Sequence, residues 1–110
     1  MQGPGPSTIE AAVGSRPAKD DLHEAFARVG KALANPHRVE MLDLLAQAER
    51  SVEGLAERAD VSVALASAHL QVLRRARLVS SRRDWNRVLY RLADDDAYAL
   101  LAALRAVAAR

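Results

Sequence analysis

SVALASAHLQVLRRARLVSSRRDWNRVLYR, residues 62–91, is the stretch that decides the fold of this chain. Its first part predicts a helix, because apolar residues recur at spacings of three and four and so share one face, at Val63, Ala66, Leu70 and Leu73. Ser62 precedes this helix and is a suitable N-cap, since its hydroxyl can accept a hydrogen bond from a backbone N–H of the first turn.

The second part of the stretch changes period and predicts a β-hairpin. Two short strands are expected over residues 78–84 and 87–92, with the turn around Asp84, Trp85 and Asn86. Seven arginines and one acid lie between residues 74 and 91. A helix followed by an arginine-rich hairpin suits duplex DNA, because the helix fits the major groove and the hairpin can follow the backbone.

Composition narrows the class of protein. With 110 residues, the chain is long enough for one domain with a single core. Half of the residues are apolar but only 4% are aromatic, and alanine and leucine dominate, which predicts a mainly α fold with a small β-hairpin. The formal charge is +2, so the clustering of arginines, and not the overall charge, points to nucleic acid. Cysteine is absent, which excludes disulfides, thiolate ligands and cysteine nucleophiles. Without a long apolar run or a signal core, we expect a cytoplasmic protein with no membrane partner.

The N-terminal part predicts a tail and then a helix. Residues 1–18 hold three of the four prolines and three of the five glycines, a density that favours a flexible tail. A single domain is expected over residues 19–110. Its first helix should span residues 20–34, because acidic residues at its start complement the helix dipole.

Cap residues mark the remaining helices. Asn35 and Pro36 predict an N-cap and the first position of a helix that carries a wide apolar surface. Ser51 can cap a short third helix to about residue 59, which forms a helix-turn-helix with the helix that follows Ser62. Asp94 and Asp95 predict the start of a last helix to about residue 109.

The last helix has more apolar surface than its own core requires. We infer a partner for it, most simply a second copy of the chain. The residues expected at that dimer interface come from the first and last helices: Leu22, Phe26, Tyr98, Leu101, Leu104 and Ala108.

Three segments resemble the ArsR/SmtB family of winged-helix transcription regulators: KALANPHRVEMLDLL (31–45), VEGLAERADVSVALASAHLQVLRRARLV (52–79) and RVLYRL (87–92). The resemblance covers roughly residues 22 to 100. It implies a winged helix-turn-helix of about five helices with a two-stranded wing. It also implies a homodimer that binds an inverted-repeat operator, usually as a repressor released by a metal ion or another signal.

The metal positions implied by the resemblance are altered in this chain. Family metal sensors often carry Cys-Val-Cys-Asp-Leu at the start of the third helix, where this chain has Ser-Val-Glu-Gly-Leu at residues 51–55. On the last helix, the expected Asp-x-His is replaced by Asp94-x-Asp96. No cofactor is therefore certain, and a nickel or zinc link stays open. The candidate ligands are weak ones without metal-motif spacing: His23, Glu24, His37, Asp94 and Asp96.

The residues expected to contact DNA lie in the helix after Ser62 and in the hairpin. Early helix positions offer methyl groups and one hydroxyl, so we expect thymine-methyl contacts and much of the affinity from arginine–phosphate pairs. Hairpin arginines are candidates for minor-groove entry. The full set is Ser62, Val63, Ala64, Ser67, Ala68, His69, Gln71, Arg74, Arg75, Arg82, Arg83, Asn86 and Arg87. Two alternatives stay open: His69 can be a packed histidine bonded to backbone or phosphate, and Trp85 can stack on a sugar, although we expect it to cover the hairpin.

The sequence carries no catalytic motif, such as a glycine-rich phosphate loop or His-Glu-x-x-His. We therefore expect a sequence-specific transcriptional regulator and not an enzyme. Two other hypotheses stay open: an effector-free regulator controlled by a partner protein, and a dimeric protein-interaction module that has lost DNA binding.

Overall fold

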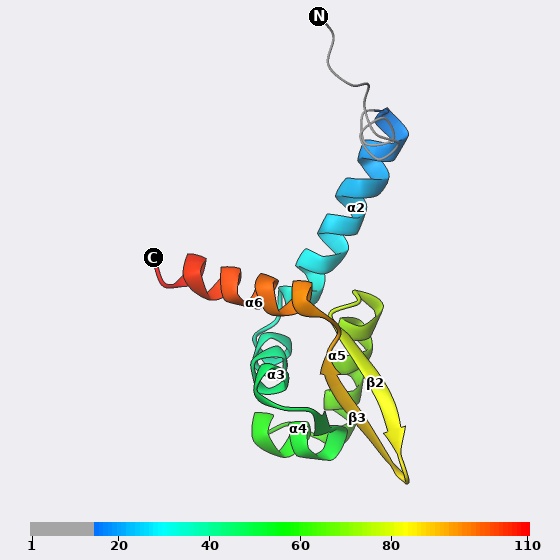
Figure 1. The fold of residues 1–110 in the computed structure, drawn as a ribbon, viewed down its shortest axis with the longest axis vertical. Helices are drawn as coiled ribbons and strands as arrows, with labels where there is room; N and C mark the ends of the chain where they lie inside the picture. The colour runs from blue at the N-terminus through cyan, green and yellow to red at the C-terminus, as the bar shows by residue number, and fades with distance from the viewer. Residues whose placement is uncertain (1–14) are drawn as a thin grey trace, which may run out of the picture. The chain divides into compact units, whose positions relative to one another are not determined.

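The computed structural model describes residues 15–110, which divide between Lys31 and Ala32 into two units that are treated separately below (Figure 1). Helix α2 (Arg16–Leu33) crosses this boundary. It begins four residues before the predicted Asp20, so residues 16–18 are helical and the prediction of a tail was wrong for them. Pro17 is tolerated there because the first helical turn does not use its own backbone N–H groups. Residues 1–14 of the predicted tail lie outside the described residues, and the single domain from residue 19 stays a prediction.

Helix α3 (Pro36–Gln47) starts as the sequence predicted. The Asn35 side chain accepts a hydrogen bond from the Arg38 N–H at 3.2 Å, and Pro36 occupies the first turn. The helix buries Met41, Leu42 and Leu45, so α3 is central to the core of the second unit.

Helices α4 (Val52–Ala59) and α5 (Val63–Arg75) form the predicted helix-turn-helix. Ser51 and Ser62 cap them, with hydroxyls that accept from the Gly54 N–H at 3.1 Å and the Leu65 N–H at 3.0 Å. Between the helices Asp60 adopts a left-handed φ of 55°, and its neighbour's N–H reaches back to the Ala56 carbonyl. This Schellman-type ending satisfies the last carbonyls of α4 and turns the chain within three residues.

The wing is the hairpin of β2 (Val79–Asp84) and β3 (Arg87–Leu92), which projects away from the helices (Figure 1). The sheet has a third strand that the sequence analysis missed: β1 (Arg50–Ser51) pairs antiparallel with β3, giving the order β1-β3-β2. This strand forms because Arg50 and Ser51 pair with Tyr90 and Leu89, and the Arg50 guanidinium also donates to the Leu44 carbonyl in the last turn of α3.

Helix α6 (Asp95–Ala108) closes the fold, with Asp94 as the predicted N-cap accepting from the Ala97 N–H at 3.0 Å. The helix buries Ala97 and Leu101. An exposed ion pair between Arg105 and Asp43 joins α6 to α3. The residues described therefore form five helices and three strands, mainly α with a small hairpin, as predicted.

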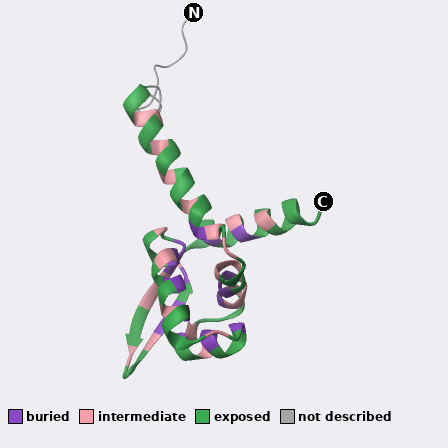
Figure 2. Cartoon of the chain, turned by 180° about the vertical axis from the view of Figure 1, so that it is seen from behind, coloured by how far each residue is buried: buried purple, intermediate pink, exposed green. Residues whose placement is uncertain are grey.

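The core lies where α3, α4 and α5 meet the sheet, and the hairpin tip is exposed (Figure 2). Its largest fully buried side chains are Met41, Leu45, Leu55, Leu70 and Leu73. Burying a leucine of this kind contributes about 1.5–3 kcal/mol, so these few positions dominate the stability of the unit. Among residues 15–110, no helix has the length and apolar character needed to cross a membrane.

Candidate nucleic-acid interface

Helix α5 buries one face and presents another. Ala66, Leu70 and Leu73 of the predicted inner face are buried, His69 is buried beside them, and Val63 of that face is 47% exposed. Val63 sits in the first turn, beyond the point where the core reaches. The exposed residues of the outer face are Val63, Ala64, Leu65, Ala68, Gln71, Arg74 and Arg75, with Ser67 half-buried at its edge.

Leu65 belongs to this outer face, and the sequence analysis missed it. Its side chain is 42% exposed, beside Ala64 and Ala68. The spacing of three and four that identifies the buried face could have revealed it, because Leu65 falls outside that pattern. An exposed leucine among alanines makes the outer face apolar as well as narrow, which suits contact with methyl groups.

His69 was expected among the DNA-contacting residues, but the structure places it in the interior. Only 9% of the residue is exposed. Its Nδ1 lies 3.4 Å from the Arg38 guanidinium, and its ring stacks on that of His37 with centroids 5.9 Å apart. Burial, together with the positive charges of Arg38 and His37, lowers the pKa of His69. His69 therefore joins α5 to α3 as a packed histidine and does not face solvent.

The pairing register decides which hairpin arginine faces α5. Ser81 pairs with Tyr90, Arg82 with Leu89 and Arg83 with Val88. Side chains alternate between the faces of a strand and cross-strand partners share a face, so Arg83 lies on the face of Tyr90 and Arg82 on the opposite face. The Gln71 amide of α5 lies 3.5 Å from the Tyr90 hydroxyl. Arg83 therefore lies on the α5 side of the wing.

Arg82 is engaged within the protein. Its guanidinium donates two hydrogen bonds to the Glu49 carboxylate, at 2.9 and 2.7 Å. These bonds lower the pKa of Glu49 and raise that of Arg82, because each charge stabilises the other. Arg82 thus connects the wing to the segment before β1, a role that residue type and spacing did not predict.

The other arginines differ in what holds them. Arg91 donates to the Ser80 hydroxyl at 3.2 Å, and Arg87 lies 3.8 Å from the Asp84 carboxylate across the turn. Within residues 15–110, no side-chain partner is recorded for Arg74, Arg75 or Arg83, which are all exposed. These three guanidiniums are free to meet an anion.

Trp85 occupies the tip of the wing with its indole in solvent. It is 92% exposed, so the expectation that it covers the hairpin was wrong. It lies in the loop beyond the last strand pair, Asp84 and Arg87, and its φ of 60° is in the left-handed region that two-residue hairpin loops use at their first position. Asn86, the other loop residue, is exposed as well.

The residues expected at a dimer interface fall in both units. Leu22 is half-buried and Phe26 exposed on α2. In the second unit, an open apolar groove between α3 and α6 is lined by Leu101, Leu104 and Ala108 together with Leu33, Val39, Asp43 and Arg105. Leu101 is itself buried and forms the floor, whereas Tyr98 is exposed.

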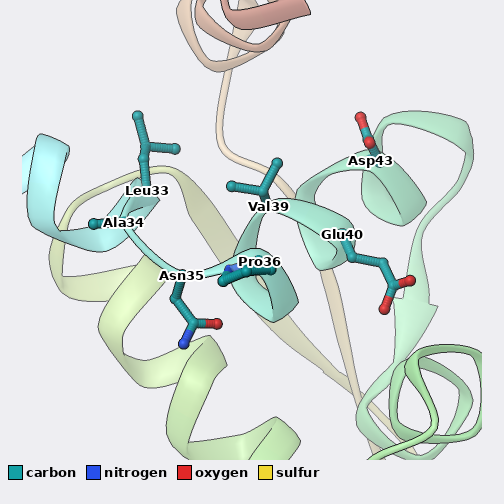
Figure 3. Close-up of a pocket in the computed structure, with 7 residues that line it drawn as sticks. All are labelled: Leu33, Ala34, Asn35, Pro36, Val39, Glu40 and Asp43. Atoms are coloured by element: carbon teal, nitrogen blue, oxygen red, sulfur yellow. The ribbon is translucent and has the colours of Figure 1, made fainter. Parts of the chain in front are cut away.

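A second hollow adjoins that groove where the chain enters α3. Figure 3 shows Leu33, Val39 and Asp43 pointing to one side of the segment that contains Asn35 and Pro36. These three side chains also line the groove toward α6, so the two hollows form one continuous surface.

The candidate metal ligands do not come together. Among residues 15–110, no three His, Cys, Asp or Glu side chains gather where they could hold a metal ion. At the two positions that the resemblance implies, the oxygen donors already serve as helix caps: Ser51 accepts from the Gly54 N–H, and Asp94 from the Ala97 N–H. His37 stacks on His69, His23 lies with its ring centroid 6.0 Å from that of Phe26, and Glu24 and Asp96 are exposed.

Comparison with known proteins identifies the family. Residues 35–81 match the family of bacterial regulatory proteins described as the arsR family. The HTH-type transcriptional regulator Rv0081 of Mycobacterium tuberculosis is 40% identical over 92 residues, which cover 83% of this chain and 81% of Rv0081. The chain belongs to the ArsR family.

Two further relatives are similar to this ArsR-type regulator in sequence or in structure. The HTH-type transcriptional regulator Rv0324 of Mycobacterium tuberculosis is 45% identical over 95 residues, 86% of this chain, but the chain spans only 42% of Rv0324. A solved homodimeric winged helix-turn-helix DNA-binding domain, fragment 1-100 of Mb0332 from Mycobacterium bovis, matches with a TM-score of 0.81 and 45% identity over 86% of this chain and 88% of that one. The chain is thus a winged helix-turn-helix transcriptional regulator of the ArsR type, as predicted. The family match ends at Ser81, so the wing tip lies beyond it.

Proposed function

We propose that this ArsR-type regulator binds an inverted-repeat operator in double-stranded DNA as a homodimer, in the bacterial cytoplasm where that DNA lies. The observation that carries the proposal is that the exposed face of α5, with small side chains at Ala64 and Ala68, lies beside the wing face that bears Arg83, unpaired among the described residues. A helix enters the major groove readily when its outer side chains are small, and arginine beside it can neutralise the phosphates that border the groove.

On α5, the proposed base contacts come from the outer face. Ala64, Leu65 and Ala68 would meet thymine methyl groups, and Gln71 is the side chain that can form paired hydrogen bonds with adenine. Ser67, half-buried at the edge, would donate to a base or a phosphate. Together with Val63 and the exposed Ser62, these residues are the DNA-contacting set predicted on the helix, with Leu65 added and His69 removed.

The proposed phosphate contacts come from arginines that the protein leaves free. Arg74 and Arg75 lie in the last turn of α5, and Arg83 lies on the α5 side of the wing. Arg87, with Asn86, lies next to the wing turn, where a narrow A·T-rich minor groove would attract it. Arg82 supports the wing through Glu49 and His69 supports α5 from within, so we assign neither a direct contact.

The proposed dimer uses apolar surfaces that each unit leaves open. The groove bearing Leu104 and Ala108 is one, and the exposed side of α2 with Leu22 and Phe26 is another. The homodimeric state of the Mb0332 domain supports this proposal. A two-fold dimer would place its two α5 helices in successive major grooves about 34 Å apart, which requires an inverted repeat with half-sites one turn apart.

A metal signal is not part of the proposal, because the altered positions do not fit one. Ser51 and Asp94 use their oxygens as helix caps, and an inducing metal needs several donors converging at about 2 Å. We propose instead that the regulator acts without its own metal, with a partner protein or another signal controlling it. Any such signal must bind the DNA-competent and incompetent states with different affinity.

The test is a titration of the purified protein onto fluorescently labelled duplex from upstream of its own gene, at two salt concentrations, with chelator and then with nickel or zinc. We expect specific binding in chelator that weakens with salt and does not change with metal. Loss of binding on adding metal would contradict the metal-free proposal while supporting operator binding. Absence of specific binding in every condition would refute the operator proposal and favour the protein-interaction module, which the apolar outer face of α5 also suits.

A further inference from the structure

The single tryptophan of the sequence lies where the hairpin itself gains little from it. Trp85 is 92% exposed, the largest exposed fraction among the large apolar side chains of residues 15–110. Tryptophan is highly buried on average, because its indole has a large apolar surface. A fully solvated indole at the end of a hairpin therefore needs an explanation outside the packing of this unit.

The backbone makes the placement more costly. Trp85 is the first residue of a two-residue loop between the paired Asp84 and Arg87, and its φ is 60°. Glycine, asparagine and aspartate are the residues that adopt such a conformation readily, whereas a bulky side chain there costs about 1–3 kcal/mol. Tryptophan is therefore unfavourable for the stability of the hairpin at this position for two reasons, namely its positive φ and its solvent-exposed indole.

The surroundings of Trp85 identify the chemistry of its partner. Of the three arginines in segment 82–87, Arg82 is bound to Glu49 and Arg87 lies 3.8 Å from the Asp84 carboxylate. Arg83 has no recorded side-chain partner among the described residues. A solvated indole flanked by guanidiniums suits a surface that offers both negative charge and flat apolar area. The sugar–phosphate wall of a DNA groove has both, since phosphates alternate with the apolar edges of deoxyriboses.

The reach of the wing fits this partner. Tyr90 lies beside Gln71 of α5, and Trp85 is five residues further along the hairpin. At about 3.4 Å per residue the tip lies roughly 17 Å along the hairpin from this contact with α5. The major groove is about 12 Å wide, so a wing starting beside a helix in that groove reaches past the bordering phosphates to the neighbouring minor groove.

We propose that Trp85 is a DNA-contacting residue, whose indole packs against the sugar–phosphate wall of the minor groove next to each half-site. This inference rests on the proposed operator binding and adds to it a contact that the family match does not reach. The free Arg83 guanidinium holds a phosphate, and contact between the indole and the deoxyriboses removes apolar surface of both from water. The contact is independent of base sequence and fixes how far the wing enters the groove.

The experiment uses Trp85 as its own probe, because no other residue contributes tryptophan fluorescence. The full chain is titrated with unlabelled duplex from its own upstream DNA while tryptophan emission and acrylamide quenching are recorded. Anisotropy of the same duplex carrying a label measures binding separately. We expect the emission to change, and acrylamide access to fall, with the same saturation point as the anisotropy.

Two variants separate the effect of the indole on DNA binding from the effect of the backbone conformation on stability. Trp85→Gly removes the side chain and relieves the positive φ, so its thermal midpoint should equal or exceed that of the natural chain. Its affinity for the duplex should nevertheless fall about thirtyfold or more, because a dimer loses two aromatic contacts with nucleic acid, and the salt dependence should stay unchanged because no charge is removed. Trp85→Phe should recover most of the loss.

The results that would contradict the tryptophan contact differ from those that would contradict operator binding. Saturable anisotropy with unchanged emission and quenching, and a Trp85→Gly variant that binds as tightly as the natural chain, would overturn the tryptophan contact and leave operator binding intact. Absence of any anisotropy change would overturn both proposals. An emission shift with vesicles of phosphatidylglycerol but none with duplex would assign the wing tip to an anionic lipid surface and overturn the DNA contact.

Discussion

Arg83→Ala should weaken operator binding and flatten its dependence on salt. Arg83 is exposed, lies on the α5 side of the wing by its pairing with Val88, and has no recorded side-chain partner within residues 15–110. A guanidinium in that position neutralises a phosphate and releases condensed counterions. The magnitude of the slope of log K against log salt should fall by about 0.9 for each lost contact, hence by about 1.8 for a dimer that loses two.

The same slope gives the loss of affinity at a chosen salt concentration. Phosphate contacts contribute almost nothing at about 1 M salt, so the two chains should bind equally there. From that common point, a change of about 1.8 in slope corresponds to about 60-fold weaker binding near 0.1 M salt and about ninefold near 0.3 M. Fluorescence anisotropy of a labelled operator duplex, measured at four salt concentrations, gives both values. The effect should be equal for operator and unrelated duplex, because a phosphate contact carries no sequence information.

Arg82→Ala is the matched control, since it removes the same charge from the neighbouring residue. The Arg82 guanidinium is bound to Glu49 on the opposite face of the hairpin, so the slope should change by less than half as much. An unchanged slope in Arg83→Ala, or an equal change in the two variants, would refute the assignment of faces on which the proposed interface rests.

Four further predictions concern stability and assembly. Leu70→Ala should lower the free energy of unfolding by about 2–5 kcal/mol in urea denaturation, because Leu70 is fully buried. Leu65→Ala should lower it by less than about 1 kcal/mol, because Leu65 is 42% exposed. Equal losses in the two variants would contradict the assigned faces of α5. Ser62→Ala should cost about 1 kcal/mol in the same assay, since its hydroxyl caps α5, and no loss would argue against the cap. Burial lowers the pKa of His69, so below about pH 6.5 the imidazole is protonated more readily in the unfolded chain than in the native one. The free energy of unfolding should therefore fall as the pH drops below about 6.5. The unfolding midpoint of His69→Gln should depend less on pH over that range than the midpoint of the natural chain. Leu104→Asp should yield monomers in sedimentation velocity and lose operator binding, whereas a stable mutant dimer would exclude the groove between α3 and α6 from the interface.

The family comparison bears on where these experiments should concentrate. The matched stretch runs from Asn35 to Ser81 and therefore includes α3, the helix-turn-helix and the start of the wing. The proposed dimer surfaces on α2 and α6 and the proposed contacts at the wing tip lie outside it.

Local chemistry made much of the fold predictable from sequence. Asn35, Ser51, Ser62 and Asp94 each cap a helix with a side chain that accepts from a backbone N–H three residues later, an interaction that neighbours along the chain decide alone. The periodicity of apolar residues located α3, α5 and α6, and the hairpin followed from the change of period on either side of the turn at residues 84–86. The clustering of arginines was equally visible, because it needs only residue type.

Tertiary structure decided what depended on residues far apart in the chain. The two-residue strand β1 carries no periodic pattern and exists because β3, about 40 residues later, pairs with it. Arg82 and Arg83 are the same residue type in adjacent positions, yet Glu49 holds one and the other stays free. His69 was expected to contact DNA but packs on Arg38 and His37 of another helix. Sequence patterns report interactions within one turn or one strand, whereas these outcomes depend on which elements pack together, and that is set only when the whole core forms.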